Sequence, residues 1–515
     1  MTSTPPLVQT AAGVVRGFWR EGADAAGVPS AAFLGIPFAE PPVGELRFAA
    51  PVPHRAWEGV RDAVEFGATP HREVQGEITL IPEPAFPGDS TLNVNVFTPA
   101  PLAPGTDAAE SAGLPVLVYI HGGGYVSGSP SSPWYDGAPF NRDGVIVVSV
   151  SYRLGFHGFG YIEDAPMNRG VRDWLLALEW VQENIANFGG DPKQVTISGQ
   201  SAGGGAVLTL LGMPAAQHLF RAVYSISGPP TTTTLDAAET VGRAIAELGG
   251  VAPTRAGLGS LSESRILELQ ASASPLNADG DESDPIAGLV GLVSGGLVLG
   301  PVVDGDLIPL PSREAYAAGI GADKALVMGA TDQEFNMILA EGKEAMAAIP
   351  AAAILGRLVD SPELVEAYVA AHEGLDTADT VGQYITDSMF RAPALDIAEL
   401  RAGRDDADAA ATWLYRFSWS SPTIGSSCHC LDVPFFFDQL GAERVSAVAG
   451  DTPSQLLADE VHGGALALIR DGAANWPAWN STDRQARVYD DPASSVESDA
   501  FATLRMLLPD TVPAA

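Results

Sequence analysis

Apolar residues between positions 115 and 230 form short runs that alternate with helical stripes. The runs from Val116 to Ile120 and from Val145 to Tyr152 have the length and β-branched content of strands buried on both faces. From Trp174 to Ile185, apolar residues recur every three or four positions, which is typical of one face of a helix. Another short strand is expected from Val195 to Ser198. This alternation predicts a mainly parallel sheet with helices on both faces.

The rest of the chain adds to the same plan. Further strands are expected from Ala325 to Gly329 and from Thr412 to Trp419. Residues 231–285 and 341–410 are rich in alanine and polar residues, and we expect them to be helical excursions from the sheet. We therefore predict one domain over the 515 residues, with a mobile tail at 509–515.

The charge balance narrows the classes of partner. The chain has 63 acidic and 28 basic residues, which gives a formal net charge of −35. A field of this sign repels phosphate backbones and anionic lipid headgroups, so we expect neither nucleic-acid nor membrane binding. Lysine occurs only at Lys193, Lys324 and Lys343. A GC-rich genome produces this pattern, and salt adaptation is the alternative explanation of the acidity.

Cysteine usage and the apolar segments bear on the compartment. The two cysteines, Cys428 and Cys430, are separated by a single residue and cannot connect distant segments, so we expect free thiols. The first 20 residues lack the pattern of a secretory signal. Glycines interrupt the longest apolar stretch, Ile286 to Val303, which makes it poor material for a membrane span. These features predict a cytoplasmic protein, as a monomer or a small homo-oligomer.

One motif points directly to chemistry. Between a predicted strand and a predicted helix stands the sequence Gly199-Gln200-Ser201-Ala202-Gly203. This G-x-S-x-G pattern is typical of a nucleophile elbow, in which a serine sits on a sharp turn that leaves no room for neighbouring side chains. It predicts Ser201 as the nucleophile and the Ala202 N–H as a donor to an oxyanion. Gln200, beside the nucleophile, is a candidate contact in the substrate pocket.

A second motif follows the strand that ends at Ile120. It reads His121-Gly122-Gly123-Gly124-Tyr125. Three glycines let backbone N–H groups approach a substrate closely, as an oxyanion hole requires. We therefore expect Gly123 and Gly124 to supply the other two oxyanion donors, and Tyr125 is a second candidate for the substrate pocket. Together the two motifs predict a serine hydrolase.

The chain resembles the type B carboxylesterases, a family that includes cholinesterases and bacterial p-nitrobenzyl esterases. The resemblance covers nearly the whole chain and rests on five segments in the family's order, namely Gly35 to Phe48, Leu92 to Pro99, Tyr152 to Phe159, Asn187 to Ala202, and Gly300 to Gly305. It implies the α/β-hydrolase fold, hydrolysis of small-molecule carboxylic esters, and no metal or cofactor.

The resemblance also implies a Ser-Glu-His triad in that chain order. Glu334 matches the family's catalytic glutamate, although Phe335 stands where a glycine usually follows, and Asp332 is the alternative acid. The base is expected to be His429, which precedes a segment similar to the family's histidine segment. The cysteines on either side of His429 give only three possible metal ligands in a row, so we expect no metal there.

Further polar contacts follow from the same resemblance. Arg47 with Asp89 and Arg153 with Asp173 match buried ion pairs of the family. Ser227 and Asp432 are expected to form a second polar shell behind His429.

In the expected mechanism, Ser201 forms an acyl-enzyme that water then hydrolyses. The same triad serves carbamates, amides and synthetic esters, so these substrates remain alternatives to simple carboxylic esters. A non-catalytic binding protein on the same fold is a further alternative, which the three filled triad positions disfavour.

Overall fold

The computed structural model describes residues 4–20, 28–72, 80–107, 109, 111–273, 297, 299–339, 342–404 and 409–509. Most of the apolar stretch that begins at Ile286, the end of the 231–285 excursion, and the predicted tail beyond Pro509 lie outside these residues. Among the described helices, none is both long enough and apolar enough to cross a lipid bilayer.

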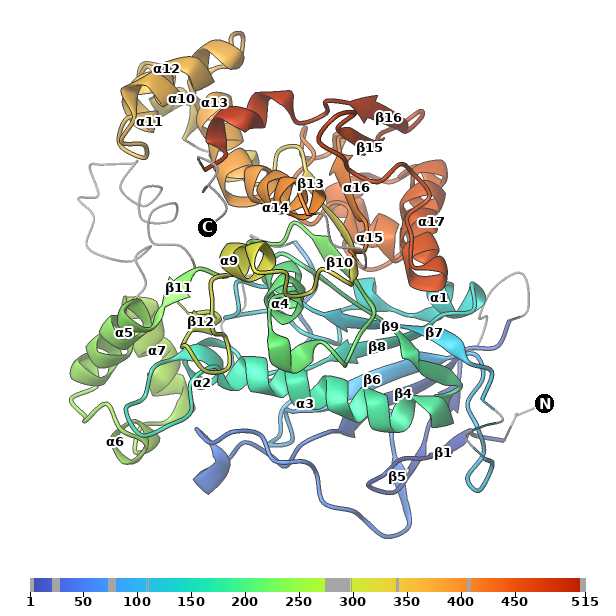
Figure 1. Cartoon of the computed structure of the whole chain (residues 1–515). Helices are drawn as coiled ribbons and strands as arrows, with labels where there is room; N and C mark the ends of the chain where they lie inside the picture. The colour runs from blue at the N-terminus through green and yellow to red at the C-terminus, as the bar shows by residue number, and fades with distance from the viewer. Residues whose placement is uncertain are drawn as a thin grey trace.

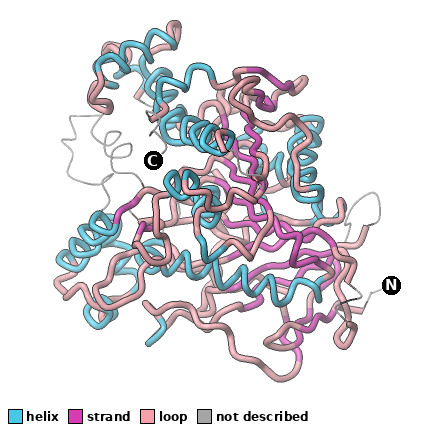
Figure 2. Tube along the Cα trace, viewed as in Figure 1, coloured by secondary structure: helices cyan, strands magenta, loops and turns pink. Residues whose placement is uncertain are grey.

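An eleven-stranded sheet runs through the molecule (Figures 1 and 2). Its strands in spatial order are β16 (Ser495–Ser498), β15 (Gln485–Tyr489), β14 (Thr412–Phe417), β13 (Ala325–Thr331), β10 (Ala222–Ile226), β9 (Gly190–Gln200), β7 (Leu114–Ile120), β8 (Ile146–Val150), β6 (Asn93–Thr98), β4 (Ala31–Pro37) and β3 (Phe18–Trp19). The seven strands from β15 to β8 are mutually parallel, and the strands at both edges are antiparallel. Small sheets are formed by β1 (Leu7–Gln9), β2 (Val14–Arg16) and β5 (Val60–Asp62), and by β11 (Thr233–Thr234) with β12 (Val302–Val303).

Side chains of the central strands are buried on both faces, as the continuous apolar runs predict. On β7, Val116 and Val118 belong to one hydrophobic core, whereas Leu117 and Tyr119 belong to the other. Successive side chains of a strand point to opposite faces, so one apolar run supplies both cores. The mainly parallel α/β plan is therefore confirmed.

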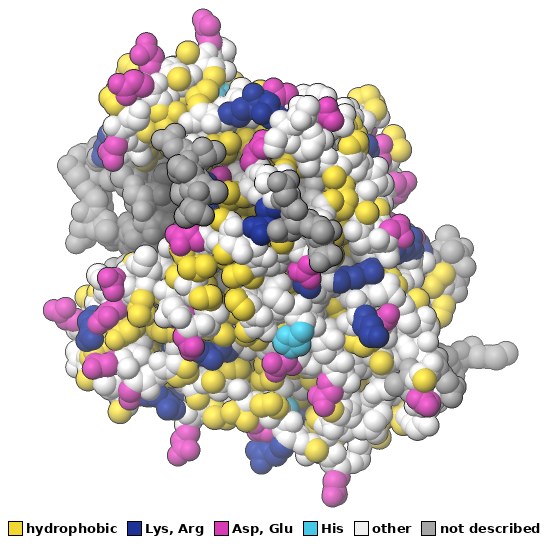
Figure 3. Space-filling view, in the orientation of Figure 1, with side chains coloured by type: hydrophobic (Ala, Val, Ile, Leu, Met, Phe, Trp, Pro, Cys, Tyr) yellow, Lys and Arg dark blue, Asp and Glu magenta, His cyan; other side chains and the backbone are white. Residues whose placement is uncertain are grey.

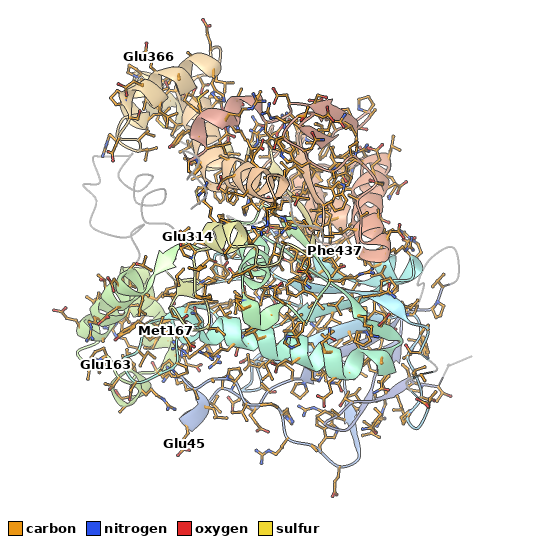
Figure 4. All side chains as sticks on the ribbon, in the orientation of Figure 1. Glu45, Glu163, Met167, Glu314, Glu366 and Phe437 are labelled. Carbon is orange, nitrogen blue, oxygen red and sulfur yellow. The ribbon has the colours of Figure 1, made fainter. Side chains whose placement is uncertain are left out.

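Helices cover both faces. The core on one face includes residues of α3 (Arg169–Asn184), α4 (Ala202–Leu211) and α14 (Ala392–Ala402). The core on the other face includes residues of α1 (Ala138–Arg142), α15 (Val433–Phe436), α16 (Val445–Ala449) and α17 (Gln455–Asp471). Phe437, which follows α15, is fully buried and lies near the middle of the molecule in Figure 4. Shorter helices are α2 (Gly155–Phe159) and α9 (Ser312–Ala317).

Two groups of helices project from the sheet (Figure 1). One comprises α5 (Leu235–Leu248), α6 (Arg255–Gly259) and α7 (Glu263–Ala273). The other comprises α10 (Lys343–Met346), α11 (Ala351–Leu355), α12 (Pro362–Ala371) and α13 (Thr377–Thr386), which pack around a small core of their own. Figure 4 shows Glu366 on α12, far from the sheet. Among the described residues of 341–410, the last helix, α14, packs on β14 of the sheet rather than on this small core.

The predicted element ends differ modestly from the structure. The strand expected from Val145 to Tyr152 is the shorter β8, and the one expected from Val195 to Ser198 is the end of the longer β9. Gly189 ends the preceding helical turn with a φ of 92°, a left-handed conformation that suits glycine. Acidic and basic side chains are scattered over the face seen in Figure 3 rather than gathered in one patch.

Candidate active site

Ser201 lies on the sharp turn between β9 and α4. Its backbone has φ 58° and ψ −125°, a strained conformation for a residue with a side chain. The turn is held by the Ser201 N–H, which donates to the Ile226 carbonyl at 2.9 Å. A Cβ atom on Gly203 would lie 2.0 Å from the Ile120 carbonyl oxygen, and one on Gly199 would lie 2.4 Å from the Gly203 backbone. The motif needs both glycines because the turn packs directly against backbone.

Glu334 follows β13 and is fully buried. One oxygen of its carboxylate accepts hydrogen bonds from the Ser227 hydroxyl at 2.6 Å and the Thr331 N–H at 2.8 Å. The other oxygen contacts Nδ1 of His429 in a short hydrogen bond. In addition, the backbone N–H of His429 donates to the backbone carbonyl of Glu334 at 2.9 Å. Side chain and backbone together fix the position of the imidazole relative to this carboxylate.

The His429 ring is buried between the acid and the end of β9. Its Nε2 lies 3.2 Å from Nε2 of Gln200. The rings of Phe335 and Phe390 pack against it, with centroids at 4.8 and 5.5 Å. Burial alone lowers the pKa of His429, but Cys430 and Glu334 act against it, and the pKa of His429 is raised well above its usual value. Cys430 and Glu334 raise the pKa because negative charge beside the ring stabilises the imidazolium.

Ser201 and His429 line one small cavity. Gly122, Gly123 and Gln200 line the same cavity. Gly123 has a φ of 107°, and a Cβ on it would lie 2.4 Å from the Ser127 carbonyl oxygen, so only glycine fits there. Gly124 follows with a φ of 60°, and Ala202 opens α4, where backbone N–H groups have no partner within the helix. The structure thus brings a hydroxyl, an imidazole and the backbone of Gly123 around one space. Gly124 and Ala202 adjoin these residues in the chain, but the described residues that line the cavity do not include them.

Tyr125, the other predicted pocket residue, lies apart from the residues that line this cavity. Its ring is buried in the core, 5.1 Å from the ring of Phe159 and 5.9 Å from that of Trp174. The described residues that line the cavity do not include it. The pocket role of Tyr125 stays a prediction, and the structure shows its ring packed into the core on a left-handed backbone with a φ of 62°.

Asp332, the alternative acid, has other partners. Its carboxylate accepts two hydrogen bonds from Arg416, at 2.6 and 2.8 Å, and one from the Ser418 hydroxyl at 2.6 Å. Arg391 lies 3.5 Å away on the other side. Asp332 is thus paired with guanidinium groups, whereas the imidazole of His429 contacts Glu334.

Among the further polar contacts expected from the sequence, one ion pair is present. Arg153 binds Asp173 through two nitrogens at 2.7 and 2.9 Å. Arg47 instead donates to the Leu261 carbonyl at 2.7 Å and approaches His157, whereas Asp89 is exposed.

The expected second polar shell is arranged differently from the prediction. Ser227 supports Glu334 rather than His429. Asp432 accepts a hydrogen bond from Tyr415 at 3.1 Å, and burial raises its pKa to about 7.

Sequence reasoning missed a buried ionic group at the cavity. Glu83 lines the cavity and accepts a hydrogen bond from the Gly128 N–H at 2.8 Å. Arg72 lies 3.6 Å from the same carboxylate. No local motif marks either residue, because the contact joins the glycine loop after β7 to a residue that lies 45 positions earlier in the chain. Within the described part of the chain, no three His, Cys, Asp or Glu side chains are grouped to hold a metal ion.

Comparisons with known proteins identify the family of this chain. Residues 4–452 match the model of the carboxylesterase family. The para-nitrobenzyl esterase of Bacillus subtilis is 30% identical over 98% of this chain and 99% of its own, and the fumonisin B1 esterase of Sphingopyxis macrogoltabida is 31% identical over 80% and 73%. The solved structure of the Geobacillus stearothermophilus carboxylesterase EST55 superposes with a TM-score of 0.81 at 30% identity, covering 97% of this chain and 99% of that one. The chain therefore belongs to the carboxylesterase family and is a carboxylic-ester hydrolase.

Proposed function

We propose that this esterase works through a Ser201-His429-Glu334 triad. One observation carries the proposal. Ser201, with its strained backbone, lines the same cavity as His429, and Nδ1 of His429 is bound to the buried carboxylate of Glu334. In the proposed cycle, Nε2 of His429 takes the Ser201 proton as Oγ attacks the ester carbonyl. Glu334 holds the tautomer and stabilises the imidazolium that forms.

The oxyanion is proposed to bind the N–H groups of Gly123, Gly124 and Ala202. Loss of one such donor typically costs roughly 3–4 kcal/mol of transition-state stabilisation. His429 then gives its proton to the leaving alcohol, which completes the acyl-enzyme. Water, activated by the same imidazole, releases the acid and restores Ser201. No step requires a cofactor.

The substrates that fit best are small esters. The cavity holds only about 20 Å³, far below the usual range for ligand pockets, so the shortest acyl groups are favoured. Rates with p-nitrophenyl esters of rising acyl length, one carbamate and one anilide would establish the preference. A carbamate or anilide hydrolysed faster than every ester would contradict the proposed substrate class.

Ser201→Ala tests the nucleophile. We expect a loss of turnover on the order of 10⁶-fold and no mass increase with a fluorophosphonate, because the attacking oxygen is gone. Ser129→Ala is the matched control, since this serine lines the same cavity but donates its hydrogen to the Pro84 carbonyl at 2.8 Å. A Ser201→Ala enzyme that retained a tenth of the activity would overturn the proposal.

A further inference from the structure

The chain changes its helical pitch between α13 and α14. Residues Asp387–Arg391 form a π-helical turn that continues directly into α14. A π turn is wider than an α-helical turn, so it rotates the side chains that follow, and such turns are frequent at functional sites. Here the turn carries Phe390, whose side chain is buried.

Phe390 reaches the catalytic imidazole from the side of the helical excursion. Its ring centroid lies 5.5 Å from that of His429 and 5.4 Å from that of Phe335, which itself lies 4.8 Å from His429. The interplanar angles to His429 are 42° and 44°, so both rings pack obliquely against the imidazole. Two apolar rings therefore pack against the imidazole of His429.

The π turn is held rigidly by a buried carboxylate. Asp387 is fully buried and accepts hydrogen bonds from the Tyr368 hydroxyl at 2.7 Å, Gln383 Nε2 at 3.0 Å and Arg391 Nη1 at 2.8 Å. Gln383 also donates to the Asp332 carbonyl at 3.0 Å. The turn is thus tied to the loop that carries the catalytic acid as well as to the ring of the base.

We propose that Phe390, presented by this π turn, is a positioning residue that holds the His429 ring in its productive orientation and keeps water from it. The inference rests on the proposed triad. A small misplacement of a reacting group lowers the rate strongly, so a ring that restrains the imidazole contributes to kcat although it touches no substrate.

The pKa of His429 provides a test of this positioning role. The titratable groups that face His429 are Glu334, from the loop after β13, and Cys430 and Asp432, from its own segment. On the π turn, Asp387 and Arg391 bind each other rather than the imidazole. Removing the Phe390 ring leaves these groups in place but admits water, and hydration favours the imidazolium.

The experiment compares Phe390→Ala and Phe390→Leu with Met389→Ala. Met389 lies in the same turn but packs against the small core of the helical excursion. For p-nitrophenyl acetate we expect kcat per fluorophosphonate-labelled site to fall about 10-fold in Phe390→Ala and about 3-fold in Phe390→Leu. KM should change little. The acidic limb of kcat/KM should move to higher pH in both variants and stay in place in Met389→Ala.

Counting labelled sites separates this inference from folding defects and from the proposed function. Partial unfolding reduces the number of labelled sites but does not shift the acidic limb of the kcat/KM profile. An acidic limb that stays or moves to lower pH in both Phe390 variants would overturn the positioning role, even if kcat fell. The triad would still stand if Ser201→Ala abolished labelling and turnover.

Discussion

Replacing Glu334 by glutamine and Asp332 by asparagine should separate catalysis from stability on one loop. The two carboxylates are two residues apart, but Glu334 binds His429, whereas Asp332 binds Arg416 and approaches Arg391. We expect Glu334→Gln to lower kcat by roughly 10⁴-fold, because an amide N–H facing Nδ1 imposes the wrong tautomer. Its hydrogen bonds from Ser227 and Thr331 can be kept by the amide oxygen, so the loss of stability should be about 1 kcal/mol.

Asp332→Asn should have the reverse effect. Breaking a buried ion pair by removing one member typically costs about 3–5 kcal/mol. The side chains of Arg416 and Asp332 are 23% and 18% exposed, so solvent screening reduces the expected cost to roughly 2–3 kcal/mol. The folded enzyme should keep a kcat within a few-fold of wild type, because the carboxylate at His429 is untouched.

Two measurements decide this comparison. Urea unfolding followed by circular dichroism gives the free energy of unfolding, and p-nitrophenyl acetate hydrolysis gives kcat in conditions where each variant is folded. If Asp332→Asn lost as much kcat as Glu334→Gln, the role of the acid would not belong to Glu334 alone. If Glu334→Gln kept a tenth of wild-type kcat, the reasoning would be refuted.

Other predictions concern the surroundings of the base. Gln200→Glu should shift the acidic limb of kcat/KM to higher pH and improve the hydrolysis of choline-type esters relative to neutral ones. The side chain of Gln200 ends 3.2 Å from Nε2 of His429, so a carboxylate there would favour the imidazolium, which cannot act as a base. An unmoved limb would show that charge at this position does not affect His429. Both buried cysteines, Cys428 and Cys430, should titrate as free thiols in denaturant without reductant, and a count of zero would contradict this. Asp432, with its pKa raised from 3.8 to about 7, binds its proton more tightly in the folded state, so wild-type stability should fall by up to roughly 4 kcal/mol between pH 4 and pH 8 for this reason. Urea unfolding of Asp432→Asn should show a smaller fall over the same range, and equal falls would refute the assignment.

The sequence predicted those parts of the molecule that local patterns determine. Apolar runs predicted five strands of the large sheet but not the central β10. The glycines of the elbow are explained by the fold, because a Cβ on Gly203 or Gly199 would lie 2.0 or 2.4 Å from backbone atoms. Side-chain direction within an irregular loop was beyond this reasoning. Tyr125 ends the glycine loop and was expected in the pocket, but its left-handed backbone accompanies a ring that fills the core. Arg47 likewise sits in a recognised motif, yet its partners come from a helical excursion whose packing no motif describes.

The choice between two acids on one loop shows why the remaining contacts need the fold. Both Asp332 and Glu334 are carboxylates after the same strand, and nothing local distinguishes them. What distinguishes them is which cations reach each one. Arg416 and Arg391 arrive from β14 and from the π turn, and they neutralise Asp332. Glu334 meets only hydroxyl and backbone donors on one oxygen, which leaves its other oxygen to the imidazole. A carboxylate already paired with two guanidinium groups has little to offer a neutral histidine, whereas one supported by neutral donors keeps its full charge for the imidazolium that the proposed mechanism requires.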